Sequence, residues 1–307
     1  MFFSRSAVGM EITQNGVRLV AIGGKKSRPR LLAQETAEFS SGTIRLAHRE
    51  PNVADPAQFV RQVREAYLKL LNRTDLVSVS LPDACGRVTL LDLETRFKSR
   101  DEGYDIIRWK LKKSLPFDIS DIHLDYQVLR EKESGEISVL AAIIARQVVS
   151  QYEDLLVEAG LKPNRIDFTS FNLYRLFSPR IAMSESCLFA ACHENVLSIM
   201  VFHQGVLEFY RAKEMHGGEP DMNRIFMETN SSLLFYRDKN PGREFREAFC
   251  LAPAGDGELF RTVIAEACGV EPFMLLPETF VDGSGTVGGG AALVPLAAAL
   301  GAAARNL

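Results

Sequence analysis

The stretch AVGMEITQNGVRLVAI at residues 7–22 decides the fold, because its apolar residues predict two β-strands joined by a tight turn at 14–16. A third strand is predicted over 30–38, and a helix over 56–72, where apolar residues recur at helical spacing. The segment LVSVSL at 76–81 alternates as a further strand. This order of hairpin, strand, helix and strand predicts an α/β lobe with a mixed sheet.

A second hairpin opens the later part of the chain. Strands are predicted over 186–192, 196–202 and 206–212, with polar turns between them. Helices and short strands follow, and an Ala-rich helix is predicted over 288–304. Because both halves begin with a hairpin-led sheet, the pattern indicates an internal duplication.

The segment between the two hairpin-led halves has a pattern of its own. Helices are predicted over 104–114 and 147–159, and strands over 124–130 and 137–144. We therefore expect a compact α+β subdomain over 87–161.

Composition excludes several classes of protein. The chain has 307 residues, 46% hydrophobic and 24% charged, which is typical of globular domains. A formal net charge of −3 provides no overall field for nucleic acid. The cysteines are odd in number and form no C-x-x-C pair, so we expect a reducing cytoplasmic setting and no metal site. The first residues lack the apolar run of a signal peptide, and 288–304 is too weakly apolar for a span, so we expect a soluble protein.

Several segments together resemble the PilM family, the cytoplasmic actin-like proteins of type IV pilus assembly. The hairpin VGMEITQNGVRLVAI, the run IIRWKLKKSLPFDISDIHLDYQVL, VVSQYEDLLVEAGLKP, SLLFYRDKNPG and the Ala-rich end occur in the family's order and spacing. The most specific part is the stretch 109–129. The cytoplasmic domain of GspL and the MshI-like pilus proteins are close relatives of this family.

The resemblance implies an α/β fold of two actin-like lobes, the duplicated ribonuclease H-like arrangement, with an inserted α+β subdomain. Lobe one is then expected over 1–180, with the subdomain at 87–161, and lobe two over 181–307. The C-terminal helix is expected to pack back on lobe one.

The family's first phosphate motif, Asp-x-Gly-x-x-x-x-Lys, falls on Glu11, Thr13 and Arg18 in this sequence. Glu11 keeps the charge of the aspartate, but its extra methylene moves the carboxylate away from the water around Mg²⁺. Thr13 places a β-branched side chain where backbone N–H groups should approach phosphate. Arg18 keeps the positive charge of the lysine.

The remaining nucleotide motifs are also altered. The second phosphate motif is expected at Ala190 and Cys192, where no carboxylate is available, and Gly255 and Gly257 only loosely replace the Gly-Gly of the adenosine motif. We therefore expect a degenerate nucleotide site, no catalytic residues and no resident cofactor, although ATP and Mg²⁺ stay open as ligands.

Three function hypotheses follow. The first is a scaffold, peripheral at the inner membrane, that binds the cytoplasmic tail of a single-pass PilN-like protein and other pilus assembly proteins, but no nucleic acid. The second is an ATPase of the same machinery, in which Glu11 and Arg18 still act at the phosphates of the nucleotide. The third is a kinase of the wider superfamily, for which no general base can be nominated.

Weaker signals have simpler interpretations. GSGTVGGG at 283–290 lacks the Lys-Ser/Thr of a phosphate loop, which favours a linker. The basic run KLKK at 110–113 favours a solvated helix face over a lipid-headgroup patch, and the aspartates between 118 and 125 favour backbone caps over a metal site. Trp109, the single Trp, is equally consistent with a peptide anchor and with the core of the subdomain.

Overall fold

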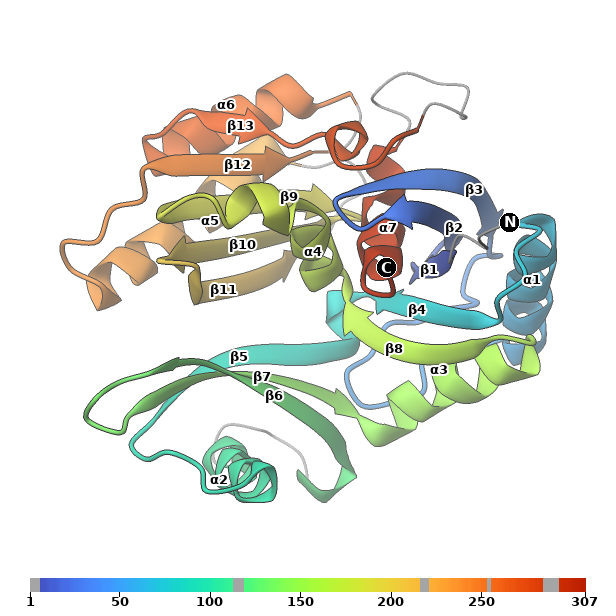
Figure 1. Ribbon diagram of the computed structural model, residues 1–307, viewed down its shortest axis with the longest axis horizontal. Helices are drawn as coiled ribbons and strands as arrows, with labels where there is room; N and C mark the ends of the chain where they lie inside the picture. Colours follow the sequence, from blue (N-terminus) through green and yellow to red (C-terminus); the bar gives the residue numbers. More distant parts are fainter. Residues whose placement is uncertain (1–5, 113–118, 216–220, 253–254, 284–292) are drawn as a thin grey trace.

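The computed structural model describes residues 6–112, 119–215, 221–252, 255–283 and 293–307. These residues form three β-sheets with helices packed on them (Figure 1). The segments 113–118 and 284–292, which contain the Leu-Pro-Phe sequence after Trp109 and most of the glycine-rich run, lie outside the described residues.

The first sheet has the strand order β3-β2-β1-β4-β8. Its strands are β1 (Ala7–Ile12), β2 (Gly16–Lys25), β3 (Arg28–Glu38), β4 (Leu76–Leu81) and β8 (Lys162–Phe168). The helices α1 (Pro56–Lys69) and α3 (Arg146–Glu158) pack on its outer face, where Phe59, Val63 and Tyr152 are buried. The Asp55 carboxylate accepts the backbone N–H of Gln58 and caps α1.

The second sheet repeats this arrangement, with the order β11-β10-β9-β12-β13. Its strands are β9 (Ser186–His193), β10 (Val196–His203), β11 (Val206–Glu214), β12 (Glu247–Leu251) and β13 (Pro272–Met274). The helices α5 (Met222–Lys239) and α6 (Gly257–Cys268) cover the outer face. In each sheet three consecutive antiparallel strands are joined to two parallel strands. The predicted duplication is confirmed.

Two helices fill the space between the sheets, α4 (Thr169–Ile181) and α7 (Ala297–Ala304). A side chain at Gly9 would overlap the Ala299 carbonyl oxygen, and one at Gly301 would overlap the Asn172 carbonyl oxygen. Glycine and alanine therefore let α7 approach both β1 and α4 at backbone distance. This close packing explains the Ala-rich composition. Short 3₁₀ turns are found at Asp83–Cys85, Ile119–Asp121, Pro277–Thr279 and Val294–Leu296.

A third sheet, with the order β5-β7-β6, is inserted between β4 and β8. It contains β5 (Gly86–Leu93), β6 (Ile122–Glu131) and β7 (Ile137–Ala145), and α2 (Arg100–Lys112) packs on one face. We call this unit, residues 86–145, the inserted subdomain.

The expected boundary of the subdomain at 161 needs a correction. The apolar face of α3, with Val148, Tyr152 and Leu156, is buried with α1 under the first sheet and not in the subdomain core. The strand β8 follows α3 and was not predicted as a strand. Both α3 and β8 therefore belong to lobe one.

No helix among the described residues is long and apolar enough to cross a membrane.

Candidate functional site

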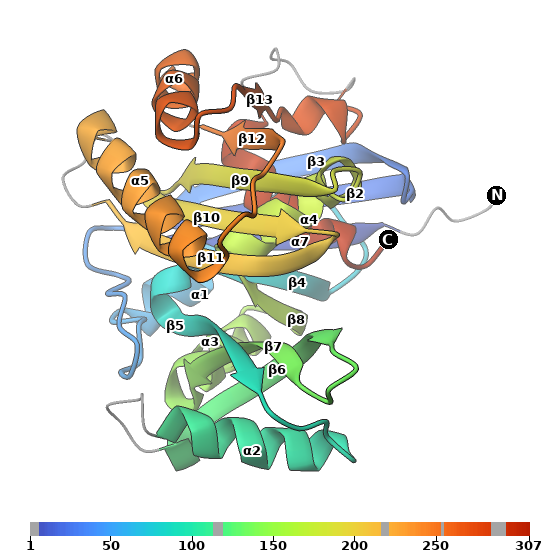
Figure 2. The ribbon, with the colours of Figure 1, turned by 90° about the vertical axis from the view of Figure 1, so that its left-hand side faces the viewer.

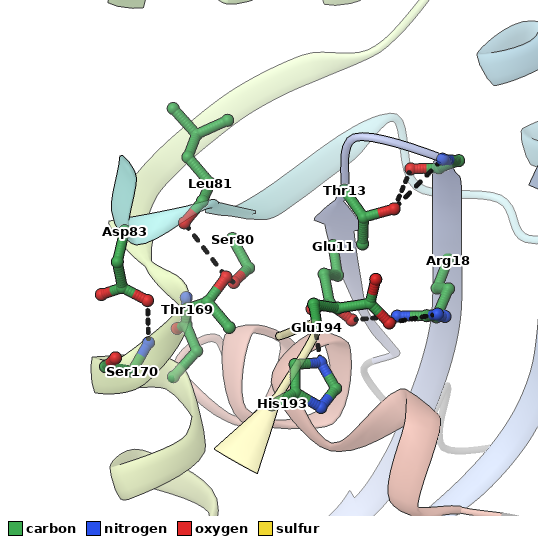
Figure 3. A network of polar contacts seen from close by, with 12 residues as sticks. Glu11, Thr13, Arg18, Ser80, Leu81, Asp83, Thr169, Ser170, His193 and Glu194 are labelled. Atoms are coloured by element: carbon green, nitrogen blue, oxygen red, sulfur yellow. Dashed lines mark hydrogen bonds and ion pairs between the residues drawn. The ribbon is translucent and has the colours of Figure 1, made fainter. Parts of the chain in front are cut away.

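The β1–β2 turn and the β9–β10 turn lie next to each other between the lobes (Figure 3). Glu11 occupies the face of β1 opposite to Met10 and Ile12, which are buried in the outer core of lobe one. Only 1% of Glu11 and 6% of His193 are exposed. Strand alternation thus directs the Glu11 carboxylate towards lobe two.

Both oxygens of the Glu11 carboxylate are engaged by side chains. Oε1 lies 2.6 Å from Nε2 of His193, and Oε2 accepts from Nη1 of Arg18 at 3.2 Å. Nη2 of Arg18 in turn donates to Oε1 of Glu194 at 2.6 Å. His193 and Glu194 come from lobe two, so these contacts join the two hairpins through alternating charges (Figure 3).

The charge state of His193 follows from this neighbourhood. Burial disfavours the imidazolium, but the Coulombic attraction and hydrogen bond of the Glu11 carboxylate outweigh burial and raise the pKa of His193 above its ordinary value. The raised pKa favours the protonated imidazole, which forms an ion pair with the Glu11 carboxylate.

Thr13 uses its hydroxyl to close the β1–β2 turn. Its Oγ1 accepts the backbone N–H of Asn15 at 3.2 Å and of Gly16 at 3.1 Å, and donates to the Gly16 carbonyl. These are the backbone amides that a phosphate in this turn would need. The hairpin satisfies them internally.

The expectation for Ala190 and Cys192 is wrong by one residue. Their side chains are buried in the outer core beneath α5 and α6, whereas Phe189 and Ala191 face the first lobe. Since His193 pairs with Val196 as Thr13 pairs with Gly16, the counterpart of Glu11 in lobe two is Ala191. No carboxylate occupies the corrected position either.

Gly255 and Gly257 lie at the start of α6, and Gly255 adopts a φ of +104°. Neither glycine lines the cavity beside Glu11. Of the expected nucleotide-site residues, the structure therefore brings together Glu11, Thr13 and Arg18 only.

Asp83 is a site residue that the sequence did not indicate. It follows β4, accepts the backbone N–H of Ser170 at 3.1 Å, and accepts the hydroxyl of Tyr210 from lobe two at 2.9 Å. Burial of the carboxyl group raises the pKa of Asp83 to about 6. Nearby, Oγ1 of Thr169 lies 3.1 Å from both Oγ of Ser80 and the Leu81 carbonyl oxygen (Figure 3).

A cavity of about 380 Å³ lies beside these groups. We call it the hairpin cavity; its lining includes Glu11, Thr13, Asp83, His193 and Asn195. A larger cavity of about 630 Å³ adjoins it at Asp83 and is lined by β5, β7 and β11. In the described part of the chain, no group of three or more His, Cys, Asp or Glu side chains could hold a metal ion.

A further cavity of about 340 Å³ separates the inserted subdomain from lobe one. We call it the edge groove. It is lined by His123 and Asp125 of β6, Ser150 and Glu153 of α3, and residues 163–168 of β8. Within the described ranges, β6 and β8 are both edge strands of their sheets. Two sheet edges thus border one cavity.

The sequence carried only a faint signal for the lobe-two partners of Glu11. His193 and Glu194 stand in a predicted polar turn, and Glu194 and Asn195 both adopt positive φ, as expected of a two-residue hairpin turn. If the two turns are treated as equivalent, His193 is the counterpart of Thr13. Only the fold shows that the turns meet.

Solved structures support the class of protein that the paired lobes define. A chain of a PilM-PilN type IV pilus biogenesis complex has a TM-score of 0.82 at 19% identity, covering 97% of this chain and 98% of that one. A protein from Bacteroides thetaiotaomicron with an actin-like ATPase fold and unknown function has a TM-score of 0.55 at 13% identity, covering 89% and 91%.

The cytoplasmic domain of EpsL, an inner membrane component of the Vibrio cholerae type II secretion system, has a TM-score of 0.53 at 14% identity, covering 96% and 95%. The fold is therefore that of the two-lobed actin-like proteins. Residues 9–232 match the family of the type IV pilus assembly protein PilM, and the chain belongs to that family. No curated protein sequence matches it.

Proposed function

We propose that this chain is a scaffold of type IV pilus assembly on the cytoplasmic face of the inner membrane, which it reaches by binding the N-terminal tail of a single-pass PilN-like protein. The scaffold does not turn over ATP. The observation that carries this proposal is the engagement of both Glu11 carboxylate oxygens by His193 and Arg18. The fold shared with a chain of a PilM-PilN complex supports the choice of partner.

The contacts of Glu11 argue against a working Mg-ATP site. A nucleotide would have to displace His193 or Arg18 from a carboxylate that is 1% exposed, leaving a buried charge without its partner. Thr13 already occupies the turn amides. Each lost charge-assisted hydrogen bond weakens binding by about 1.5–3 kcal/mol, and about 1.4 kcal/mol is tenfold in affinity. Two such losses move a micromolar site into the millimolar range.

The edge groove suits an extended peptide. A strand added to the edge of β6 or β8 forms main-chain hydrogen bonds, which give affinity without catalytic residues. The groove also offers both signs of charge, with Glu153 on α3 and Arg165 on β8. A short tail can therefore be held by its backbone and selected by its side chains.

The ATPase alternative rests on the hairpin cavity, which keeps space for a ligand beside Glu11 and Asp83. It requires that His193 and Arg18 release Glu11 when nucleotide enters. A nucleotide-dependent loss of the ion pair would favour this alternative, and its absence favours the scaffold.

Isothermal titration of the purified chain with synthetic N-terminal tails of PilN-like proteins tests the proposal. We expect a dissociation constant in the micromolar to nanomolar range, equivalent to about −8 to −12 kcal/mol. A scrambled tail of the same composition is the control. Equal binding of both peptides, or binding of neither, contradicts the proposal.

A further inference from the structure

The inserted subdomain has one face covered by α2 and the other turned towards the two lobes (Figure 2). Ile107 of α2 is buried against its sheet, whereas Trp109 on the same helix is 64% exposed and is therefore not part of the subdomain core. The chain passes between the subdomain and lobe one at Gly86 and Ala145, which lie at neighbouring ends of the paired strands β5 and β7. Two neighbouring connections do not by themselves fix the angle of the subdomain, so the contacts at its far end matter.

A β-bulge near that far end turns two successive side chains of β6 towards lobe two. Side chains of a regular strand alternate between the faces of the sheet, so Leu129 and Arg130 would ordinarily point in opposite directions. The pairing of β6 with β7 shifts between Val128 and Arg130, which leaves Leu129 as the extra residue. Leu129 packs against the apolar core between the lobes, and Arg130 reaches Glu208 of β11. The bulge thus directs both side chains to one surface.

Glu208 is held in position by two other groups of lobe two. Its Oε2 accepts the hydroxyl of Tyr236 at 2.9 Å, and its Oε1 accepts from Nη1 of Arg243. Nη2 of Arg130 lies 3.2 Å from the same Oε1. The side chain of Glu208 is 10% exposed and that of Arg130 is 28% exposed, so water screens this ion pair less than it screens pairs on the open surface.

We infer that the Arg130–Glu208 ion pair sets the angle between the inserted subdomain and lobe one, and that Arg130 is thereby a positioning residue for a tail in the edge groove. His123 and Asp125, which line the groove, lie on the same strand as Arg130. Arg130 itself lies about 17 Å further along β6 and is not part of the groove lining.

The opposite border of the groove, β8, belongs to the first sheet. Because β6 moves with the subdomain and β8 with lobe one, the angle between these two bodies decides whether one extended peptide can contact both edges. The tail as the ligand of the groove rests on the proposed function. The role of the ion pair in fixing the angle does not, and it can be measured without a tail.

Titration of the full chain with the PilN-like tail tests the effect on binding. Arg130→Gln removes the charge and leaves Glu208 with Arg243 and Tyr236. We expect about tenfold weaker tail binding, an effect within the range for residues coupled to a site that they do not touch.

Arg96→Gln is the matched control. Arg96 pairs with Glu131 inside the inserted subdomain, and both side chains are exposed. The substitution is the same and lies in the same subdomain, but it removes no contact with lobe two. Arg96→Gln should therefore bind the tail like the parent.

A double-mutant cycle isolates the ion pair from the other contacts of its members. Glu208→Gln should weaken tail binding at least as much as Arg130→Gln, since it also affects Arg243 and Tyr236. The double variant should bind no more weakly than Glu208→Gln alone, because the ion pair can be lost only once. Losses that add in the double variant overturn the inference.

A distance measurement by electron paramagnetic resonance reads the angle without a tail. All five native cysteines are buried, so spin labels can be attached to cysteines introduced at two exposed positions, Glu133 in the β6–β7 turn and Asp154 on α3. We expect a broader distribution of label distances in Arg130→Gln than in the parent or in Arg96→Gln. Adding the tail should narrow it.

Unchanged label distances in Arg130→Gln overturn the inference, as does tail affinity equal to that of the parent. Broadening of the same size in Arg96→Gln also overturns it, because the effect is then not specific to the contact with lobe two. If the parent itself binds no tail, the scaffold proposal is contradicted, while the label distances still decide the role of Arg130.

Discussion

The hairpin cavity and the edge groove both lie at junctions between parts of the chain, but their polar groups are in different states. In the hairpin cavity, the Glu11 carboxylate is bound on both oxygens and the turn amides are bound by Thr13. In the edge groove, the strands β6 and β8 present the outer edges of two sheets. The polar groups of the first cavity are thus bound by internal contacts, whereas the second is bordered by two edge strands, to which the scaffold proposal adds a third strand.

The two hairpins are joined by side chains of the chain itself. The ion pairs Glu11–His193 and Arg18–Glu194 cross from one hairpin to the other. Under the scaffold proposal, the hairpin cavity contributes to stability and the edge groove to binding. Mutations in the two places should therefore affect different measurements.

Breaking the buried ion pair should have the largest effect. Glu11→Gln removes the charge opposite His193, which is 6% exposed, and should lower the free energy of unfolding by about 3 kcal/mol. Urea unfolding measures the change, and tail binding should stay as in the parent.

Glu194→Gln is the matched control, because Glu194 pairs with Arg18 from a position 31% exposed. A partly exposed pair contributes about 1 kcal/mol or less. If both variants lose the same stability, the buried contact is not what joins the hairpins.

Filling the edge groove should have the next largest effect, and on binding alone. Ser150→Tyr on α3 places a ring in the groove and should weaken tail binding by about 30-fold, or about 2 kcal/mol. Ser231→Tyr, on the exposed surface of α5, is the control for the added ring. Titration of both variants decides the location, since unchanged affinity of Ser150→Tyr would exclude this groove.

A pH series should reveal the smallest effect. The pKa of His193 is raised in the folded protein, so its contribution to stability is fully present below the unfolded value of about 6.5 and is lost as pH rises through the folded pKa. The titration of Asp83, raised to about 6, lies mostly below this window. Unfolding free energies above pH 6.5 should fall with pH in the parent and stay flatter in His193→Gln. Parallel curves would contradict the ion pair.

The sequence predicted the paired hairpins and the helices around them, because turn residues and apolar periodicity are local signals. It missed β8, whose sequence KPNRIDF contains a proline and charged residues, as an edge strand allows. It assigned α3 to the subdomain, because periodicity reveals that a helix has an apolar face but not which sheet that face meets.

The sequence placed site residues together correctly only within the first hairpin. Glu11, Thr13 and Arg18 lie in a hairpin with a recognisable motif. The error at Ala190 arose because all eight residues of β9 are buried, so no alternation of apolar and polar residues shows which side chains face the first lobe. His193 is 182 positions away from Glu11, and its role follows only from the packing of the lobes.

The most direct test of the scaffold is a pair of calorimetric titrations on one sample, with the PilN-like tail and with Mg-ATP. The account predicts micromolar or tighter binding of the tail and no saturable heat from Mg-ATP below the millimolar range. A dissociation constant for Mg-ATP below about 100 μM, accompanied by phosphate release, would contradict it.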